Sequence, residues 1–340
     1  MLNQAVYLLT VGEGSEVYAD RALVSIVSLK ITNPSLPVRL VCDSESARRL
    51  QESGHRLPGL CDSLEAVETP EGSLVYRHRW IKTQLPRFLG GGGIHLDADT
   101  LVRGSLTALP QGDWDFAAVP DYNRWDMAEH LRTLPHVIQA LELGWPLDLT
   151  RYLNSGVFCW KDTPAVHAFF AAWHRLWQEG VRGGGLLQDQ PSFNTTLQRG
   201  LVSQATLPNA FNTMVLPAWD LSPEAVVWHF WSAGGWKDHS FAQLVEQAKH
   251  LGTERLTANV RRAIRFSRPW PNSGRGLARL LDWRGHRYGG YRTAERLWLS
   301  GQRRATLLHL LRRVQGAAKR SGPPGRAAIP TPGGNPRPHR

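Results

Sequence analysis

Cysteine is scarce in this chain of 340 residues, which contains only Cys42, Cys61 and Cys159. Three cysteines so far apart form neither a disulfide framework nor a pair with metal-ligand spacing. Their number therefore excludes a small disulfide-stabilised fold and a cysteine-based zinc site. We expect reduced thiols and a cytoplasmic protein.

Long apolar runs are also lacking. No stretch approaches the roughly 20 apolar residues that a membrane-spanning helix needs, which excludes an integral membrane protein. The first residues have no basic segment ahead of a long apolar one, and the short run from Ala5 to Val11 suits a buried strand better than a signal peptide. With 42% hydrophobic and 20% charged residues, the composition is that of a globular protein with one large or two modest domains.

Acidic residues are rare in the last quarter of the sequence. Residues 254–340 contain 20 Lys and Arg but only three acidic residues, a net charge of +17, whereas residues 1–253 carry −6. Leu307, Leu308, Leu311 and Val314 lie at helical spacing among arginines, a pattern typical of basic helices on anionic membrane surfaces. A helix packed on the body, a nucleic-acid-binding arm and a solvated Arg-rich face remain alternatives.

Three segments follow from this charge distribution. Residues 1–252 are expected to form the catalytic domain, and residues 253–320 a basic helical extension that allows peripheral contact with the inner face of the membrane. Residues 321–340 are rich in Pro and Gly and are expected to be disordered. Nucleic acid is not the partner that we expect.

The first 50 residues alternate between strand and helix patterns. Residues 6–9 and 38–42 are apolar strands, and helices are predicted over about 16–31 and 43–50. This alternation predicts a parallel sheet covered by helices, with ligands bound beyond the carboxyl ends of the strands. The loop that contains Thr10 and Gly12 follows the first strand and is a candidate for such a position.

The sequence Ile-His-Leu-Asp-Ala-Asp-Thr-Leu-Val at 94–102 ends an apolar strand with two carboxylates. Side chains two residues apart in an extended chain point the same way, so Asp97 and Asp99 can converge. Two converging carboxylates repel each other unless a cation or a proton lies between them, and a divalent ion is the natural partner. An Asp-rich turn that merely ends a strand is the alternative.

Four further segments carry polar residues in suggestive places. A predicted basic helix at 76–89 includes Lys82, which either is solvated or reaches a diphosphate. Asn-Ser-Gly at 154–156 interrupts an apolar strand, as a bulge or a close ligand does. Asp189 and Gln190 open a helix, and a last strand delivers His229. A lone histidine in an apolar strand is more often a core residue than a ligand, so the interpretation of His229 depends on the other segments.

Together these segments resemble glycosyltransferase family 8, which has the GT-A fold. The resemblance covers residues 5–240 and rests on Leu-Asp-Ala-Asp-Thr-Leu-Val at 96–102, Leu-Asn-Ser-Gly-Val-Phe at 153–158, Asp-Gln-Pro-Ser-Phe-Asn at 189–194 and Trp-His-Phe at 228–230 with Gly234 and Lys237. It implies an α/β fold, with a GT-A Rossmann-like mixed sheet flanked by helices and followed here by the basic helical extension.

The resemblance also implies an activity: retaining, metal-dependent transfer of a hexose from a nucleotide sugar, most simply a UDP-sugar, to a glycan or glycolipid acceptor. By the same resemblance Mn²⁺ or Mg²⁺ would be bound by Asp97, Asp99 and His229, and Asn154, Asp189 and Gln190 would act on the donor sugar. The residues implied in nucleotide-sugar binding are Thr10, Gly12, Lys82, Asp97, Ala98, Gly156, Gly234 and Lys237. The final motif departs from the family pattern, because Lys237 lies eight residues after His229 instead of six and Asp238 stands in place of proline.

Two other functions remain open. A sugar nucleotidyltransferase would require a basic, Gly-rich loop after the first strand, but Gly-Glu-Gly at 12–14 is short and acidic. A non-catalytic carbohydrate- or nucleic-acid-binding protein would not need the two aspartates and the histidine to be intact.

Overall fold

The computed structural model describes residues 3–109, 112–231, 239–267 and 269. In its first half, the strands β1 (Ala5–Leu9), β2 (Val38–Asp43), β3 (Ser63–Val67) and β4 (Gly93–Leu96) run parallel in the order β3-β2-β1-β4. Helix α1 (Val17–Thr32) follows β1, and α2 (Ser44–Glu52) follows β2. The predicted strand and helix alternation is therefore correct.

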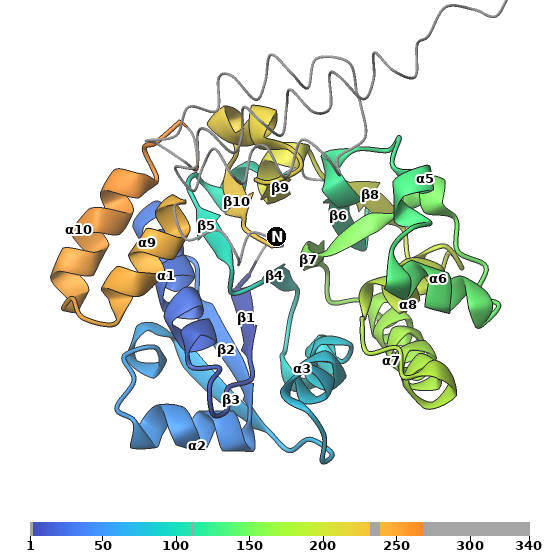
Figure 1. The fold of residues 1–340 in the computed structure, drawn as a ribbon, viewed down its shortest axis with the longest axis horizontal. Helices are drawn as coiled ribbons and strands as arrows, with labels where there is room; N and C mark the ends of the chain where they lie inside the picture. Colours follow the sequence, from blue (N-terminus) through green and yellow to red (C-terminus); the bar gives the residue numbers. More distant parts are fainter. Residues whose placement is uncertain (1–2, 110–111, 232–238, 268, 270–340) are drawn as a thin grey trace, which may run out of the picture. The chain divides into compact units, whose positions relative to one another are not determined.

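The other half of the sheet reverses direction at β7 (Leu153–Trp160). This strand pairs antiparallel with both β4 and β6 (Phe116–Pro120), and the short β8 (Gln204–Thr206) pairs parallel with β6. The result is a seven-stranded mixed sheet in the order β3-β2-β1-β4-β7-β6-β8, flanked by helices (Figure 1). This is the mixed α/β architecture that the sequence predicts.

A second, three-stranded sheet lies beside the end of β4. It contains β5 (Thr100–Val102), β10 (Val227–His229) and β9 (Thr213–Met214) in the order β5-β10-β9. Strand β10 is antiparallel to β5, with His229 opposite Thr100. This register places His229 next to the turn that joins β4 to β5.

The helix predicted at 76–89 is divided into α3 (Leu74–Lys82) and α4 (Leu85–Phe88). A similar division occurs farther along the chain, where α5 (Ala128–Leu131) is followed by α6 (Pro135–Glu142). Pro86 and Pro135 lie in the first turn of the second member of each pair. A proline has no N–H to continue the preceding helix but is well tolerated at a helix start.

The remaining helices cover the sheet or follow it. Helix α7 (Pro164–Gly184) ends at Gly185, which adopts a left-handed conformation with φ 68°, and α8 (Gln190–Leu197) follows. Helices α9 (Ser240–Ala248) and α10 (Thr253–Ala263) lie against α1 (Figure 1). Short 3₁₀ turns occur at Pro58–Leu60, Leu106–Ala108, Asp121–Asn123 (η3), Leu149–Arg151, Asn209–Asn212 (η5) and Trp219–Glu224 (η6).

Aromatic residues form much of the core between the sheet and α7 and α8. Phe158 of β7 packs against Phe116 of β6 at a ring separation of 5.1 Å, and against Trp173 of α7 at 6.1 Å. Each fully buried side chain of this size contributes roughly 1.5–3 kcal/mol to the hydrophobic stabilisation. Trp173, Trp177 and Trp228 are completely buried, as expected for tryptophans that pack in a core.

The basic section is described only as far as residue 269. Within it, α10 buries Leu256, Val260 and Ala263. The rest of the predicted extension, residues 270–320, and the predicted tail, residues 321–340, lie outside the described residues. Across the described part of the chain, no helix is both long and apolar enough to span a bilayer.

Candidate metal centre and active site

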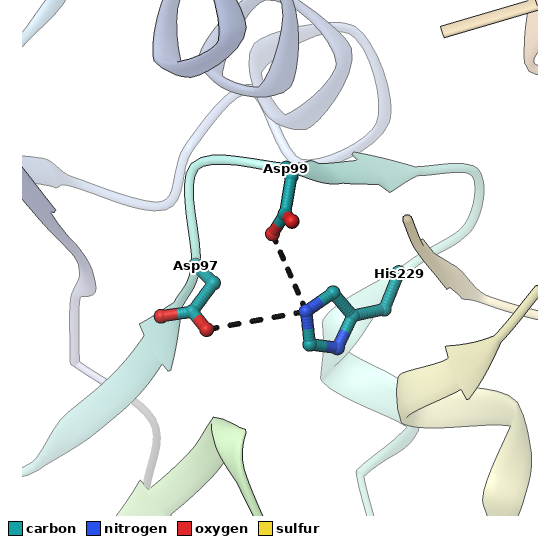
Figure 2. A group of neighbouring side chains, drawn as sticks. All are labelled: Asp97, Asp99 and His229. Carbon is teal, nitrogen blue, oxygen red and sulfur yellow. Dashed lines mark ion pairs between the residues drawn. The ribbon is translucent and has the colours of Figure 1, made fainter. Parts of the chain in front are cut away.

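Two aspartates and a histidine meet at the junction of the two sheets. Asp97 and Asp99 lie in the turn between β4 and β5, and His229 ends β10. Nε2 of His229 is 3.3 Å from Oδ1 of Asp99 and 3.9 Å from Oδ2 of Asp97 (Figure 2). The two carboxylates converge because the chain turns between them, and not through the strand alternation that the sequence suggests.

The three side chains suit a divalent metal ion. One ligand atom from each lies within 4.8 Å of the others, and an octahedral ion with short oxygen and nitrogen bonds separates neighbouring ligand atoms by about 3 Å. Nε2 of His229 is buried without a hydrogen-bond partner, and Nδ1 of the same ring lies 2.9 Å from Oδ1 of Asn212. A histidine anchored through one nitrogen, with the other facing carboxylates, is typical of metal ligands.

The other carboxylate oxygen of Asp97, Oδ1, is fixed by two neighbouring side chains. Oδ1 accepts hydrogen bonds from Nε2 of His95 at 2.9 Å and from the ammonium of Lys82 at 3.2 Å. Burial alone would raise the pKa of Asp97, but Lys82 and His95 outweigh it and hold this pKa well below its ordinary value. Asp97 is therefore ionised at neutral pH.

Lys82 also approaches a second carboxylate. Its ammonium lies 3.5 Å from Oδ2 of Asp189, and Nε of Arg79 lies 2.9 Å from Oδ1 of the same residue. Burial would raise the pKa of Asp189, but the two cations on α3 lower it. Lys82 is thus a buried bridge between Asp97 and Asp189, and its predicted contact with a diphosphate stays a prediction.

Asn154 and Gln190 form an amide network with Asp121. Nδ2 of Asn154 and Nε2 of Gln190 each donate to one oxygen of the Asp121 carboxylate, both at 2.9 Å. The side-chain oxygens of the two amides accept backbone N–H groups from Gly156, at 2.9 Å, and from Ser155, at 3.1 Å. Burial raises the pKa of Asp121, and the two amides counteract this shift by stabilising the carboxylate.

Gly156 makes room for the candidate metal ligands Asp97, Asp99 and His229, which we call the metal cluster. A Cβ atom at this position would lie 2.8 Å from Oδ2 of Asp97 and still closer to Cε1 of His229. The carbonyl of Gly156 also accepts the backbone N–H of Asp97 at 2.9 Å. The glycine of the Asn-Ser-Gly sequence therefore allows β7 to approach the turn between β4 and β5.

The loop after β1 lies at the same edge of the sheet. Val6 of β1 pairs with His95 of β4 in parallel, so both strands end on that side. Thr10 is buried and donates from Oγ1 to the carbonyl of Leu74, and the α-carbon of Gly12 faces the Leu74 side chain. Ala98 occupies the turn between the two aspartates.

Gly234 and Lys237, the remaining predicted nucleotide-sugar contacts, lie outside the described residues. A cavity of about 680 Å³ lies between α1 and α9 and reaches Asp99. It is lined by Asp99, Arg21, Lys249 and the stacked rings of Phe230, His239 and Phe241, among others.

The sequence does not single out His95, Asp121 or Asn212 as site residues. Asp121 carried a usable signal, because it directly follows an apolar strand at the edge where ligands bind. His95 and Asn212 carried none. His95 lies within an apolar strand, and Asn212 reaches the site only through the pairing of β9 with β10.

No protein-family model matches this sequence, and no curated protein matches it. The structure is similar to the galactosyltransferase LgtC in complex with donor and acceptor sugar analogues, with 17% sequence identity, a TM-score of 0.45, and coverage of 76% of this chain and 95% of LgtC. It is also similar to the glycosyltransferase GlyE of Streptococcus pneumoniae TIGR4, with 14% identity and a TM-score of 0.48, over 75% of this chain and 63% of GlyE. Mouse xyloside xylosyltransferase 1 matches with 12% identity and a TM-score of 0.42, over 67% of this chain and 97% of the other. All three of these proteins are glycosyltransferases.

Proposed function

We propose that this chain is a retaining, divalent-metal-dependent glycosyltransferase, which moves a hexose from a nucleotide sugar, most simply a UDP-sugar, to a glycan or glycolipid acceptor. The metal is proposed to be Mn²⁺ or Mg²⁺, held by Asp97, Asp99 and His229. One observation carries the proposal: the unpartnered Nε2 atom of His229 faces two carboxylates, at 3.3 and 3.9 Å.

The leaving group of such a reaction is a nucleoside diphosphate, on which negative charge develops. A divalent ion bound by the three ligands would stabilise that charge as a Lewis acid. Two carboxylates and one imidazole leave coordination positions free for phosphate oxygens. The cavity of about 680 Å³ beside Asp99 lies in the size range of small-molecule sites.

The sugar-side residues of the proposal are Asn154, Asp189 and Gln190. The Asp189 carboxylate stays ionised beside Arg79 and Lys82 and can stabilise positive charge on an oxocarbenium-like sugar. Gln190 is oriented at both ends, by the N–H of Ser155 and by Asp121. A preorganised dipole of this kind stabilises developing charge without having to reorganise during the reaction.

Thermal unfolding in the presence of nucleotides tests the proposal. We expect UDP with Mn²⁺ to stabilise the wild-type protein by about 2.7 kcal/mol at 100 times the dissociation constant, and UDP without metal to do much less. GDP and CMP are the comparison nucleotides. The Asp99→Ala variant should lose the metal-dependent shift, whereas Asp126→Ala, which removes a 71% exposed carboxylate, should keep it.

Activity is then measured as metal-dependent release of UDP from UDP-hexoses, with anomeric configuration followed by NMR. A wild-type protein that no nucleotide stabilises with or without Mn²⁺ would contradict the proposal and favour a binding protein. Strong, salt-sensitive binding of DNA or RNA in place of nucleotide binding would point to the same alternative.

A further inference from the structure

A chain of side chains links Asp121 to the candidate metal ligand His229. Asn154 donates from Nδ2 to Asp121 at 2.9 Å, and Asn212 donates from Nδ2 to Oδ1 of Asn154 at 3.0 Å. Oδ1 of Asn212 then lies 2.9 Å from Nδ1 of His229. All four side chains are buried, and none is more than 5% exposed. We call this chain the amide relay.

The direction of the relay is fixed by groups that cannot reverse their roles. The backbone N–H of Gly156 can only donate, and it lies 2.9 Å from Oδ1 of Asn154. At the other end of the same amide, the Asp121 carboxylate can only accept. Asn154 therefore presents its oxygen to Asn212, so Asn212 must present its NH₂ group to Asn154 and its oxygen to the imidazole.

Asn212 is itself held in place by the turn η3. Asn123 donates from Nδ2 to the carbonyl of Asn212 at 2.8 Å and accepts the backbone N–H of Met214 at 2.7 Å. Tyr122 and Asn123 both adopt φ of 58°, a left-handed conformation that is uncommon for residues other than glycine. The side chain of Asn123, which lies in this turn, thus fixes the position of Asn212.

His229 needs such a relay if it is to present an Nε2 lone pair to a metal ion. Two carboxylates, those of Asp97 and Asp99, face Nε2 of His229, the atom that a metal ion would have to bind. With no acceptor at Nδ1, a neutral ring would donate its single proton from Nε2 to one of these carboxylates. An amide oxygen at Nδ1 holds a proton there instead, so that a neutral ring has its lone pair on Nε2.

We propose that Asn212 is a positioning residue, which keeps Nδ1 of His229 protonated through the amide relay and so reserves Nε2 for the metal ion. This inference rests on the proposed function, because it takes Asp97, Asp99 and His229 as metal ligands. It assigns roles to Asn212 and Asp121 that the sequence motifs do not contain.

The first test is nitrogen-15 NMR of the histidine rings in the metal-free wild-type protein, without any variant. We expect Nδ1 of His229 to carry a bonded proton that exchanges slowly with solvent, at neutral pH and at about pH 8. A ring protonated on Nε2 alone would overturn the proposal. The signals of exposed histidines such as His167 report on the integrity of the sample.

Two substitutions separate positioning from simple packing. Asn212→Leu removes the acceptor at Nδ1, so the Nδ1 proton should be lost and the dissociation constant for Mn²⁺, measured by electron paramagnetic resonance, should rise about 10–100-fold. Asn212→Asp keeps an oxygen at Nδ1, so it should retain the Nδ1 proton and bind Mn²⁺ more tightly than Asn212→Leu. An Nδ1 proton that persists in Asn212→Leu, or equal losses of affinity in both variants, would contradict the proposal.

The matched control is Asn259→Leu on α10, which removes an amide that bonds Gln247 of α9 and should change neither measurement. The two proposals fail separately. A wild-type protein that has the Nδ1 proton but does not bind Mn²⁺ refutes the proposed function. One that binds Mn²⁺ with His229 protonated only on Nε2 before metal addition refutes the relay.

Discussion

The ammonium of Lys82 lies 3.2 Å from Oδ1 of Asp97, on a lysine side chain that is only 1% exposed. The same ammonium is 3.5 Å from Asp189, so one buried cation lies between two carboxylates. Its removal would leave Asp189 paired with Arg79 alone and Asp97 bonded to His95 alone, so that the repulsion between the two carboxylates would be less well compensated.

We therefore expect Lys82→Met to destabilise the protein by about 3–5 kcal/mol, the usual cost of breaking a buried pair by removing one partner. Urea unfolding followed by circular dichroism measures this change. Lys249→Met is the control, because Lys249 is 40% exposed and pairs with Glu246, so the free energy of unfolding should change by no more than about 0.5 kcal/mol. Equal effects of the two substitutions would mean that Lys82 does not compensate the carboxylates.

A methyl group added at Gly156 should disturb the metal cluster more than the fold. The new Cβ would lie 2.8 Å from Oδ2 of Asp97 and would also press on the His229 ring, so one of these two ligands must shift. We expect Gly156→Ala to weaken Mn²⁺ binding at least about 10-fold by isothermal titration calorimetry. Gly59→Ala has no atom within 4 Å of its added Cβ and should bind the ion as the wild type does.

His174 should make the stability of the protein depend on pH. Burial lowers its pKa from 6.5 to about 4, and Nδ1 lies 2.7 Å from Oγ1 of Thr83. The unfolded state then binds a proton more readily than the folded state, so this residue stabilises the fold fully above about pH 6.5, and less as the pH falls toward about 4. His174→Gln should flatten this part of the profile of unfolding free energy against pH. The same substitution at the exposed His167 should leave the slope unchanged, and a slope that survives in His174→Gln would place the pH dependence elsewhere.

Arg103 links the residues just after α10 to β10, the strand that carries His229. Its guanidinium stacks 3.9 Å over the ring of Trp228 and donates to the carbonyls of Ser222 at 2.8 Å, Ala225 at 2.9 Å and Ile264 at 3.2 Å, as well as to Phe266. Burial lowers its pKa to about 10.

Arg103→Met should remove the guanidinium donor from the carbonyls of Ala225, Ile264 and Phe266 and the stacking on Trp228, at a cost of about 2–4 kcal/mol in unfolding free energy. Hydrogen exchange should speed up in α10 and β10 before it does in β1 and β2. Arg255→Met, on the exposed face of α10, is the comparison. An equal increase in hydrogen exchange over all four elements would argue against the view that Arg103 stabilises α10 and β10 locally.

The sequence predicts the local parts of this site better than their connections. Three local parts were recognisable because each combines an apolar element with polar residues at its end: the strand that leads to Asp97 and Asp99, the Asn154 strand and the start of α8. That these parts lie close to His229 could be predicted only from the family resemblance, because a single histidine in an apolar strand does not indicate which residues it contacts. The structure brings Asp97, Asp99 and His229 together as that resemblance implies.

The contacts made to Asp97, Asp99 and His229 by other side chains, directly or through the amide relay, could not be predicted. The role of Asn212 depends on the register of β9 and β10, and that of Asp121 on the close approach of β6 and β7, which are pairings between distant parts of the chain. The split of the predicted 76–89 helix was foreseeable from Pro86, but the burial of Lys82 was not. Buried lysines are rare, and the position looks like an ordinary solvated one in sequence.

The pairing of β10 with β5 also bears on how the protein is made. The aspartates belong to a strand and turn that leave the ribosome long before His229, which arrives with the last strand of the small sheet. Domains generally fold from the N-terminal side during synthesis, so the nascent chain would pass through a stage that holds Asp97 and Asp99 but lacks His229, the third proposed ligand. Tight binding of the ion at this cluster would have to await the insertion of β10, and a chain truncated before residue 227 could form most of the main sheet without acquiring the complete cluster.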